Sequence, residues 1–239
     1  MIHFSHTSKR YPALNGQGGH DALLDVNFKL DEGEMAFLTG HSGAGKSTLL
    51  KLIALIERPT RGQVIINNLN LAKVSRRKIP YHRRNIGIIF QDHQLLFDRT
   101  VFDNVALPLV IAGVPVREIG KRVRASLDKV GLLNRERAYP ITLSGGEQQR
   151  VGIARAVVNK PGVILADEPT GNLDPELSKE IMHTFDQFSQ VGVTVLIATH
   201  ALDLIKDMPR RTLVLKAGKL IHDTGINSNI DGADEDDDA

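Results

Sequence analysis

A glycine-rich run after residue 39 has the composition of a phosphate-binding loop. The sequence Gly40-His-Ser-Gly-Ala-Gly-Lys-Ser47 fits the pattern G-x-x-x-x-G-K-[ST] and follows the apolar stretch Met35–Thr39. Glycines let the backbone curl so that successive N–H groups point at phosphate oxygens, and a following helix adds the positive end of its dipole. The lysine of the pattern can reach the β- and γ-phosphates, and the serine hydroxyl can ligate Mg²⁺. The candidate nucleotide-binding residues here are Gly40, His41, Ser42, Gly43, Ala44, Gly45, Lys46, Ser47 and Thr48.

Two adjacent acids, Asp167 and Glu168, end a second apolar run. A carboxylate at the end of a buried strand can hold the Mg²⁺ shell, and the next residue is placed to activate water. The alternative is that both acids cap the turn that follows. Phosphoryl transfer requires charge neutralisation, a metal and an oriented water, and these acids would supply all three together with Lys46 and Ser47. We therefore expect Glu168 to act as general base and Lys46 to take part in catalysis.

A third polar segment, Leu143-Ser-Gly-Gly-Glu-Gln-Gln-Arg150, lies between the first two motifs. Ser144 and the amides of Gly145 and Gly146 could contact a γ-phosphate, with Glu147 near the N-terminal end of a helix. A capped helix start is an equally good description, because capping and anion binding use the same unpaired N–H groups. One domain has little use for two phosphate cradles. We therefore expect the second cradle to serve the nucleotide of a neighbouring copy.

This third segment resembles the signature of the ATP-binding-cassette (ABC) ATPases, and further elements of that family follow in order. The resemblance implies that Tyr11 stacks on adenine, that Gln91 joins the metal site to a helical insertion, that Asp174 lies in a dimer-crossing loop, and that His200 contacts the γ-phosphate as a catalytic switch. Taken alone, each fits an ordinary surface, capping or core residue. The resemblance also implies that two copies meet head to tail around two ATP molecules, and that the Mg²⁺ ligands are Ser47, Gln91 and Asp167.

Longer stretches resemble a narrower group, the bacterial cell-division ATPases, over about residues 1–222. This resemblance implies a peripheral ATPase on the cytoplasmic face of the bacterial inner membrane at the division site. It also implies pairing with an FtsX-like integral membrane protein, indirect contact with other divisome components, and control of septal peptidoglycan hydrolysis. Ala201, after the switch histidine, departs from the acid that is usual there. The run 166–174 is shared with relatives in lipoprotein release and macrolide export, so a transporter subunit stays the alternative. The stretches that carry the resemblance are 34–50, 89–96, 98–106, 128–133 and 149–161.

Apolar runs and helical patterns alternate along the chain, and they must position these motifs. Several runs are continuously apolar, which is typical of sheet strands covered on both faces. The pattern therefore predicts an α/β fold with a mostly parallel core sheet, an antiparallel β edge subdomain and an all-helical insertion, and the resemblance implies that this fold is a P-loop NTPase of ABC type. Residues 11–21 are predicted to form a hairpin loop. The predicted strands are 2–5, 26–30, 35–39, 64–66, 86–90, 162–166, 193–198, 212–215 and 219–222, and the predicted helices are 45–56, 116–130, 147–159 and 176–190.

Length and charge suggest one domain followed by a tail. The chain has 239 residues and no cysteine, which excludes disulfide scaffolds, thiolate metal sites and cysteine nucleophiles. We expect a single nucleotide-binding domain over 1–225, with its helical subdomain at about 92–158. Residues 226–239 carry six acids and no base, so a disordered acidic tail is predicted there and the rest of the chain has a net charge of +8. No apolar stretch approaches the ~20 residues of a membrane-spanning helix, and no secretory signal is apparent.

Two surface features have more than one interpretation. The basic run 73–84 fits a solvated helix face, or less well a surface for nucleic acid or anionic lipid, since Tyr81 is its one aromatic residue. We expect no nucleic-acid partner, because ABC proteins of DNA repair and translation usually carry paired cassettes, coiled-coil insertions or zinc cysteines. The second feature is apolar and fits either a groove for a membrane partner helix or the core of the insertion. Its residues are Leu95, Leu96, Phe97, Val101 and Phe102.

Overall fold

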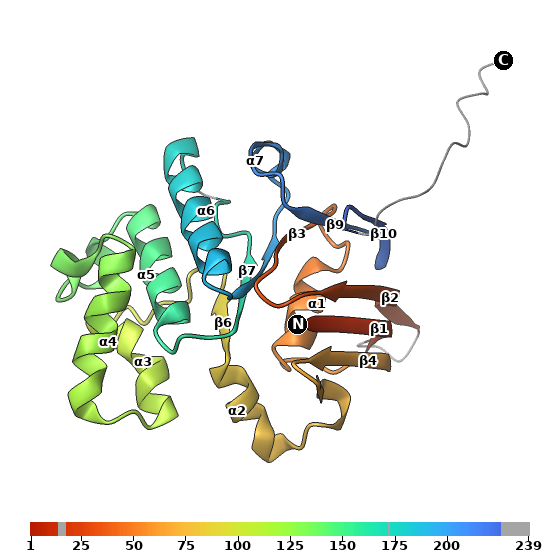
Figure 1. Ribbon diagram of the computed structural model, residues 1–239, viewed down its shortest axis with the longest axis horizontal. Helices are drawn as coiled ribbons and strands as arrows, with labels where there is room; N and C mark the ends of the chain where they lie inside the picture. The colour runs from red at the N-terminus through yellow and green to blue at the C-terminus, as the bar shows by residue number, and fades with distance from the viewer. Residues whose placement is uncertain (14–17, 172, 226–239) are drawn as a thin grey trace.

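Two sheets and a group of helices make up the described part of the chain, residues 1–13, 18–171 and 173–225, in this computed structural model (Figure 1). The larger sheet has the strand order β10-β9-β3-β8-β7-β6, and its strands from β9 to β6 run parallel. The predicted α/β class with a mostly parallel core sheet is therefore confirmed. The strands of this sheet are β3 (Met35–Thr39), β6 (Ile86–Ile89), β7 (Val163–Asp167), β8 (Thr194–Ala198), β9 (Arg211–Lys216) and β10 (Lys219–Asp223).

The smaller sheet is antiparallel and has the order β2-β1-β4-β5. Its first two strands form a hairpin in which Tyr11 pairs with His20 and Pro12 pairs with Gly19. The loop predicted for residues 11–21 was therefore too long at both ends, because cross-strand pairing continues to Pro12. Residues 14–17, at the tip, lie outside the described residues. The strands are β1 (Ile2–Pro12), β2 (Gly19–Leu30), β4 (Arg61–Ile66) and β5 (Leu69–Asn70).

Three long helices follow β6 before the chain returns to the sheet at β7. All residues of this stretch are described, none is in a strand, and the helices stand together at the left of Figure 1. The predicted helical insertion is therefore confirmed. Its first helix was missed because Pro108 lies inside it and proline normally ends a helix. The helices are α1 (Lys46–Ile53), α2 (Ile79–Arg84), α3 (Val101–Ala112), α4 (Val116–Lys129), α5 (Gly145–Val157), α6 (Pro175–Gln190) and α7 (Leu202–Asp207).

The central strands are buried on both faces, and each face belongs to a different core. On β7, Ile164 packs into the cluster formed with α3–α6, whereas the next residue, Leu165, packs into the cluster formed with α1 and the smaller sheet. On β3, Phe37 packs into the first of these clusters and Leu38 packs into the second. Successive side chains of a strand point to opposite faces, so a continuously apolar strand requires cover on both sides.

The described helices include none that is long and apolar enough to cross a lipid bilayer. The predicted acidic tail, 226–239, lies outside the described residues.

Removal of a large core side chain tests this packing. Phe185 of α6 is fully buried in the cluster that joins α6 to the sheet. We expect Phe185→Ala to lower the free energy of unfolding by about 3–5 kcal/mol, because it removes apolar burial and leaves a cavity. Denaturant unfolding measures the change. Glu180→Ala, on the exposed side of the same helix, should change the free energy by less than about 0.5 kcal/mol, and equal effects of the two substitutions would contradict the described packing.

Candidate functional site

A cavity of about 860 Å³ opens where the parallel strands end. Loops at the carboxyl ends of parallel strands meet at one edge of the sheet, which is the usual place for ligands in α/β proteins. The residues that line it come from segments far apart in the chain. Among those predicted, they are Tyr11, Gly40 to Thr48, Gln91, Asp167, Glu168 and His200.

The loop between β3 and α1 depends on glycine at two positions. Gly40 has φ 147°, and a Cβ there would lie 2.2 Å from the carbonyl oxygen of Leu215. Gly45 has φ 110°, and a Cβ there would lie 2.5 Å from the carbonyl oxygen of Ala22. The loop therefore passes so close to neighbouring backbone that no side chain fits. α1 then begins at Lys46 with no side-chain cap, so its first N–H groups remain available to an anion.

Lys46 is held inside this loop rather than extended into water. Its side chain is buried, and its Nζ donates to the carbonyl oxygen of Gly40 at 2.7 Å and to that of His41 at 3.4 Å. The same Nζ lies 4.0 Å from Oε1 of Glu168. The loop thus positions a cation beside its own N–H groups, as an oligophosphate requires.

Glu168 is fixed between this lysine and the predicted switch histidine. Its Oε1 lies 2.8 Å from Nδ1 of His200, and its Oε2 accepts from the backbone N–H of His200 at 3.3 Å. Its own N–H donates to the carbonyl oxygen of Ala198 at 2.8 Å. The backbone of Glu168 has φ 49°, a left-handed conformation that costs free energy in a residue with a side chain. The end of β7 is therefore strained in the conformation that directs this carboxylate at the cavity.

Asp167 is electrostatically unusual for a carboxyl group. Burial raises its pKa, the neighbouring Glu168 adds to the rise, and Ser47 and Lys46 oppose it. A divalent cation would favour the ionised form. Ser47 and Gln91 also line the cavity, so a hydroxyl, an amide and a carboxylate oxygen are available together, a donor set that suits Mg²⁺.

The predicted signature segment lies apart from this lining. Ser144 caps α5: its Oγ accepts from the N–H of Glu147 at 3.2 Å, and its own N–H donates to Oε2 of Glu147 at 2.9 Å. These bonds lower the pKa of Glu147. Gly145 is exposed, whereas Gly146 packs so tightly that a Cβ would lie 2.1 Å from Leu177. Asp174 likewise caps a helix, α6, by accepting from the N–H of Leu177 at 2.9 Å.

Sequence reasoning missed several residues of the lining. His20 lines the cavity because it pairs with Tyr11 across the hairpin, and Lys216 and Ile221 reach it from β9 and β10. The register of the hairpin is the signal that would have identified His20. Nothing local in the sequence connects Lys216 or Ile221 with the loop after β3.

Known proteins share both the sequence pattern and the fold. The ABC transporter family profile matches residues 23–171. The cell division ATP-binding protein FtsE of Escherichia coli (strain K12) is 59% identical over 220 residues, 92% of this chain and 97% of the relative. FtsE of Bacillus subtilis (strain 168) is 44% identical over 223 residues, 93% of this chain and 96% of the relative.

A solved structure has the same fold. It is the dimeric structure of a post-hydrolysis state of the ATP-binding cassette MJ0796 bound to ADP and Pi, with a TM-score of 0.86 and 34% identity over 93% of this chain and 97% of that chain. The chain therefore belongs to the ABC transporter family of ATPases. Within that family it belongs to the group of cell division ATP-binding proteins, FtsE, as the resemblance of the longer stretches implied.

The raised pKa of Asp167 leads to a test that needs no ligand. Burial makes the ionised carboxylate unfavourable in the folded state, and this penalty is present above the folded-state pKa. It disappears as the pH falls towards the ordinary value of 3.8. We therefore expect Asp167→Asn to raise the free energy of unfolding at neutral pH, with a gain that shrinks as the pH is lowered.

Denaturant unfolding of both proteins between pH 4 and pH 8 measures this gain. Asp98→Asn, at an exposed acid, is the matched control and should show no comparable gain. A loss of stability at neutral pH in Asp167→Asn would contradict the assignment of burial as the dominant cause.

Proposed function

We propose that this chain is the ATP-hydrolysing subunit of a membrane-attached cell-division complex and that it works as a head-to-tail dimer. One observation carries the proposal. The phosphate loop, both acids and the predicted switch histidine line one cavity, while the exposed start of α5 at Ser144 lies outside that lining.

Within one copy, different lining residues would contact different parts of ATP. Tyr11 lies on β1 at the edge of the cavity, where it can stack on adenine, and the loop from Gly40 to Thr48 surrounds the phosphates. Lys46 supplies positive charge to the terminal phosphates. Ser47, Gln91 and Asp167 are the residues that would hold Mg²⁺, which would neutralise developing charge on the phosphate oxygens.

Glu168 is the residue placed to accept a proton from water. Its carboxylate is nearly buried, oriented by His200 and close to Lys46, so it cannot turn away from the cavity without breaking these contacts. His200 has an exposed side chain, which leaves its other ring nitrogen accessible to a γ-phosphate. The contact with Glu168 orients His200 directly, so orientation does not depend on an acid at position 201.

The second copy would complete the reaction chamber. Ser144 and Gly145 are exposed at the N-terminus of α5, and the same capping geometry that satisfies the helix leaves further N–H groups to bind an anion. The related cassette MJ0796 is described as dimeric with ADP and Pi bound. ATP would therefore join two copies, and its hydrolysis would release them.

Part of the insertion would bind the membrane partner. Leu95 and Val101 of the predicted apolar groove are buried in the core, and Phe102 packs against that core, so three of its residues belong to the insertion itself. Leu96 and Phe97 are 41% and 53% exposed, and they closely follow Gln91. A partner helix docked there would sense changes at Gln91, because both belong to the segment that leads from the cavity into the insertion.

Loss of the base provides the sharpest test of the chemistry. General-base assistance is worth ~10²–10⁴-fold, so Glu168→Gln should bind ATP and hydrolyse it slower by about that factor. It should also accumulate as a dimer when ATP and Mg²⁺ are present. Phosphate release and analytical ultracentrifugation measure the two effects. Glu32→Gln, at an exposed turn, should retain full turnover, and full turnover by Glu168→Gln would remove this residue from the base role.

Partner docking can be tested by paired substitutions of equal exposure. Leu96→Glu should abolish co-purification of the membrane partner in mild detergent, because a charge would be buried against an apolar helix. Leu133→Glu, at a residue also 41% exposed in the insertion, should leave co-purification intact. Retention of the partner by Leu96→Glu would reject this surface, and a partner identified as a solute or lipoprotein exporter would reject the cell-division role.

A further inference from the structure

A second cavity, of about 760 Å³, lies between α4, the C-terminal ends of α5 and α6, and β7. It shares no lining residue with the nucleotide cavity. Its floor is apolar and comes from the end of α5, the start of β7 and the end of α6, with Val157, Ile164 and Phe188 among the residues. Its volume is within the range of ligand sites, about 300–1,000 Å³.

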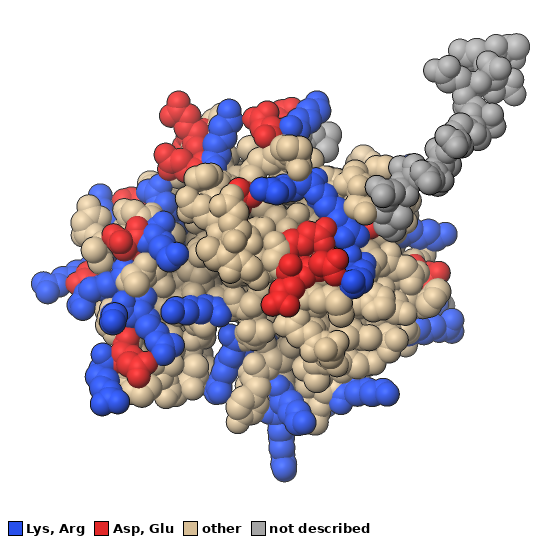
Figure 2. All heavy atoms as spheres, viewed as in Figure 1, with Lys and Arg blue, Asp and Glu red and all other residues tan. Residues whose placement is uncertain are grey.

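The rim of this cavity is strongly cationic. Five basic side chains line it against one acid, Glu118, which is already paired with Arg122 at 2.7 Å. Lys129 lies over the ring of Phe188, with its Nζ 5.6 Å from the centroid. Figure 2 shows Lys and Arg side chains gathered over the helices on this side of the molecule. An anionic occupant therefore suits this rim. The basic residues are Arg117, Lys121, Arg122, Lys129 and Lys160.

We propose that the acidic segment 226–239 of the same chain binds in this cavity. Its sequence is strongly anionic, with six acids between Asp231 and Asp238 and no base. These acids suit the cationic rim.

The segment begins at the end of the sheet where the parallel strands start, which is also the end where this cavity lies. Gly225 donates its N–H to Asp223 at 2.9 Å, and Asp223 pairs with Arg211 at the start of β9. The pairing continues across the sheet at the same level. Arg211 of β9 pairs with Ala36 of β3, and Ala36 pairs with Leu196 of β8. Leu196 then pairs with Leu165 of β7. The floor residue Ile164 precedes Leu165. Gly225 lies at the end of β10, one strand beyond Arg211, so four strand spacings, about 19 Å, separate it from the floor.

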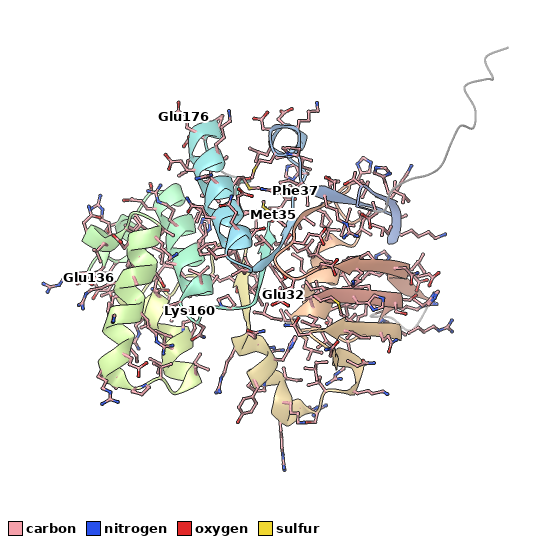
Figure 3. The ribbon with its side chains drawn as sticks, viewed as in Figure 1. Glu32, Met35, Phe37, Glu136, Lys160 and Glu176 are labelled. Atoms are coloured by element: carbon pink, nitrogen blue, oxygen red, sulfur yellow. The ribbon has the colours of Figure 1, made fainter. Side chains whose placement is uncertain are left out.

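The length and the charge distribution of the segment fit this distance. Six extended residues from Gly225 to Asp231 span up to about 20 Å, so the first acid reaches the cavity. In the view of Figure 3, Glu32 lies between β10 and Lys160, in the turn before β3. The residues that would pass this acidic turn, 226–230, carry no charge, so they meet no repulsion there.

The absence of native cysteine makes a direct test possible. We would introduce Ala233→Cys in the segment and Ala125→Cys in the cavity lining of the full-length chain, and trap contacts by mild oxidation. The control pairs Ala233→Cys with Glu32→Cys, which is exposed and lies nearer the start of the segment. Docking predicts several-fold more disulfide with position 125 than with position 32. Equal or greater trapping at position 32, or disulfides formed only between copies, would overturn the proposal.

A second measurement tests the role of charge. On the background with cysteines at 125 and 233, Lys121→Gln/Lys129→Gln should reduce trapping several-fold, and high salt should do the same. Arg76→Gln/Arg77→Gln, in an exposed basic run outside the cavity, should leave trapping unchanged, and Lys160→Gln alone provides a milder rim variant if the double variant folds poorly. A disulfide yield that does not change when the charge of the rim is reduced would overturn the proposal. None of these readouts involves ATP turnover, so they stand or fall separately from the proposed function.

Discussion

The register of the parallel strands is the constraint on which the site depends. Leu38 of β3 and Asp167 of β7 both pair with Ala198 of β8, so the three strands end at one level. Whatever follows each strand must therefore meet at a single edge. The phosphate loop, Glu168 and His200 are those following residues, and the short contacts among Lys46, Glu168 and His200 result from it. Burial on both faces holds the register, because a one-residue slip would exchange the two cores.

Several features of the cavity lining oppose the stability of the folded chain. Glu168 has a left-handed backbone, Asp167 is a half-buried carboxyl with a raised pKa, and the loop requires glycine where a Cβ would strike backbone oxygen atoms. Each feature opposes stability or removes freedom, and all three occur within one cavity. Such costs persist where the surrounding structure determines them, and here the two large cores do so.

Local patterns predicted the strands of the larger sheet and the turn of the glycine-rich loop between β3 and α1, because continuous apolar runs and glycine spacing depend on neighbours in sequence. Helix α3 was missed because Pro108 lies inside it and proline normally ends a helix. The hairpin was misjudged because pairing across strands is not a local property. His20 and Lys216 could not have been assigned to the cavity without the register. The apolar run at 95–102 divides between core and surface, a division that only the packing decides.

We propose that each reaction chamber contains walls from two copies. A disulfide experiment can detect this arrangement by mixing one copy that carries Ser42→Cys in the phosphate loop with another that carries Ser144→Cys, both with Glu168→Gln. We expect a disulfide between the two different copies that forms with ATP and Mg²⁺ and is lost with ADP. A yield that does not depend on the nucleotide, or no disulfide between unlike copies, would contradict it.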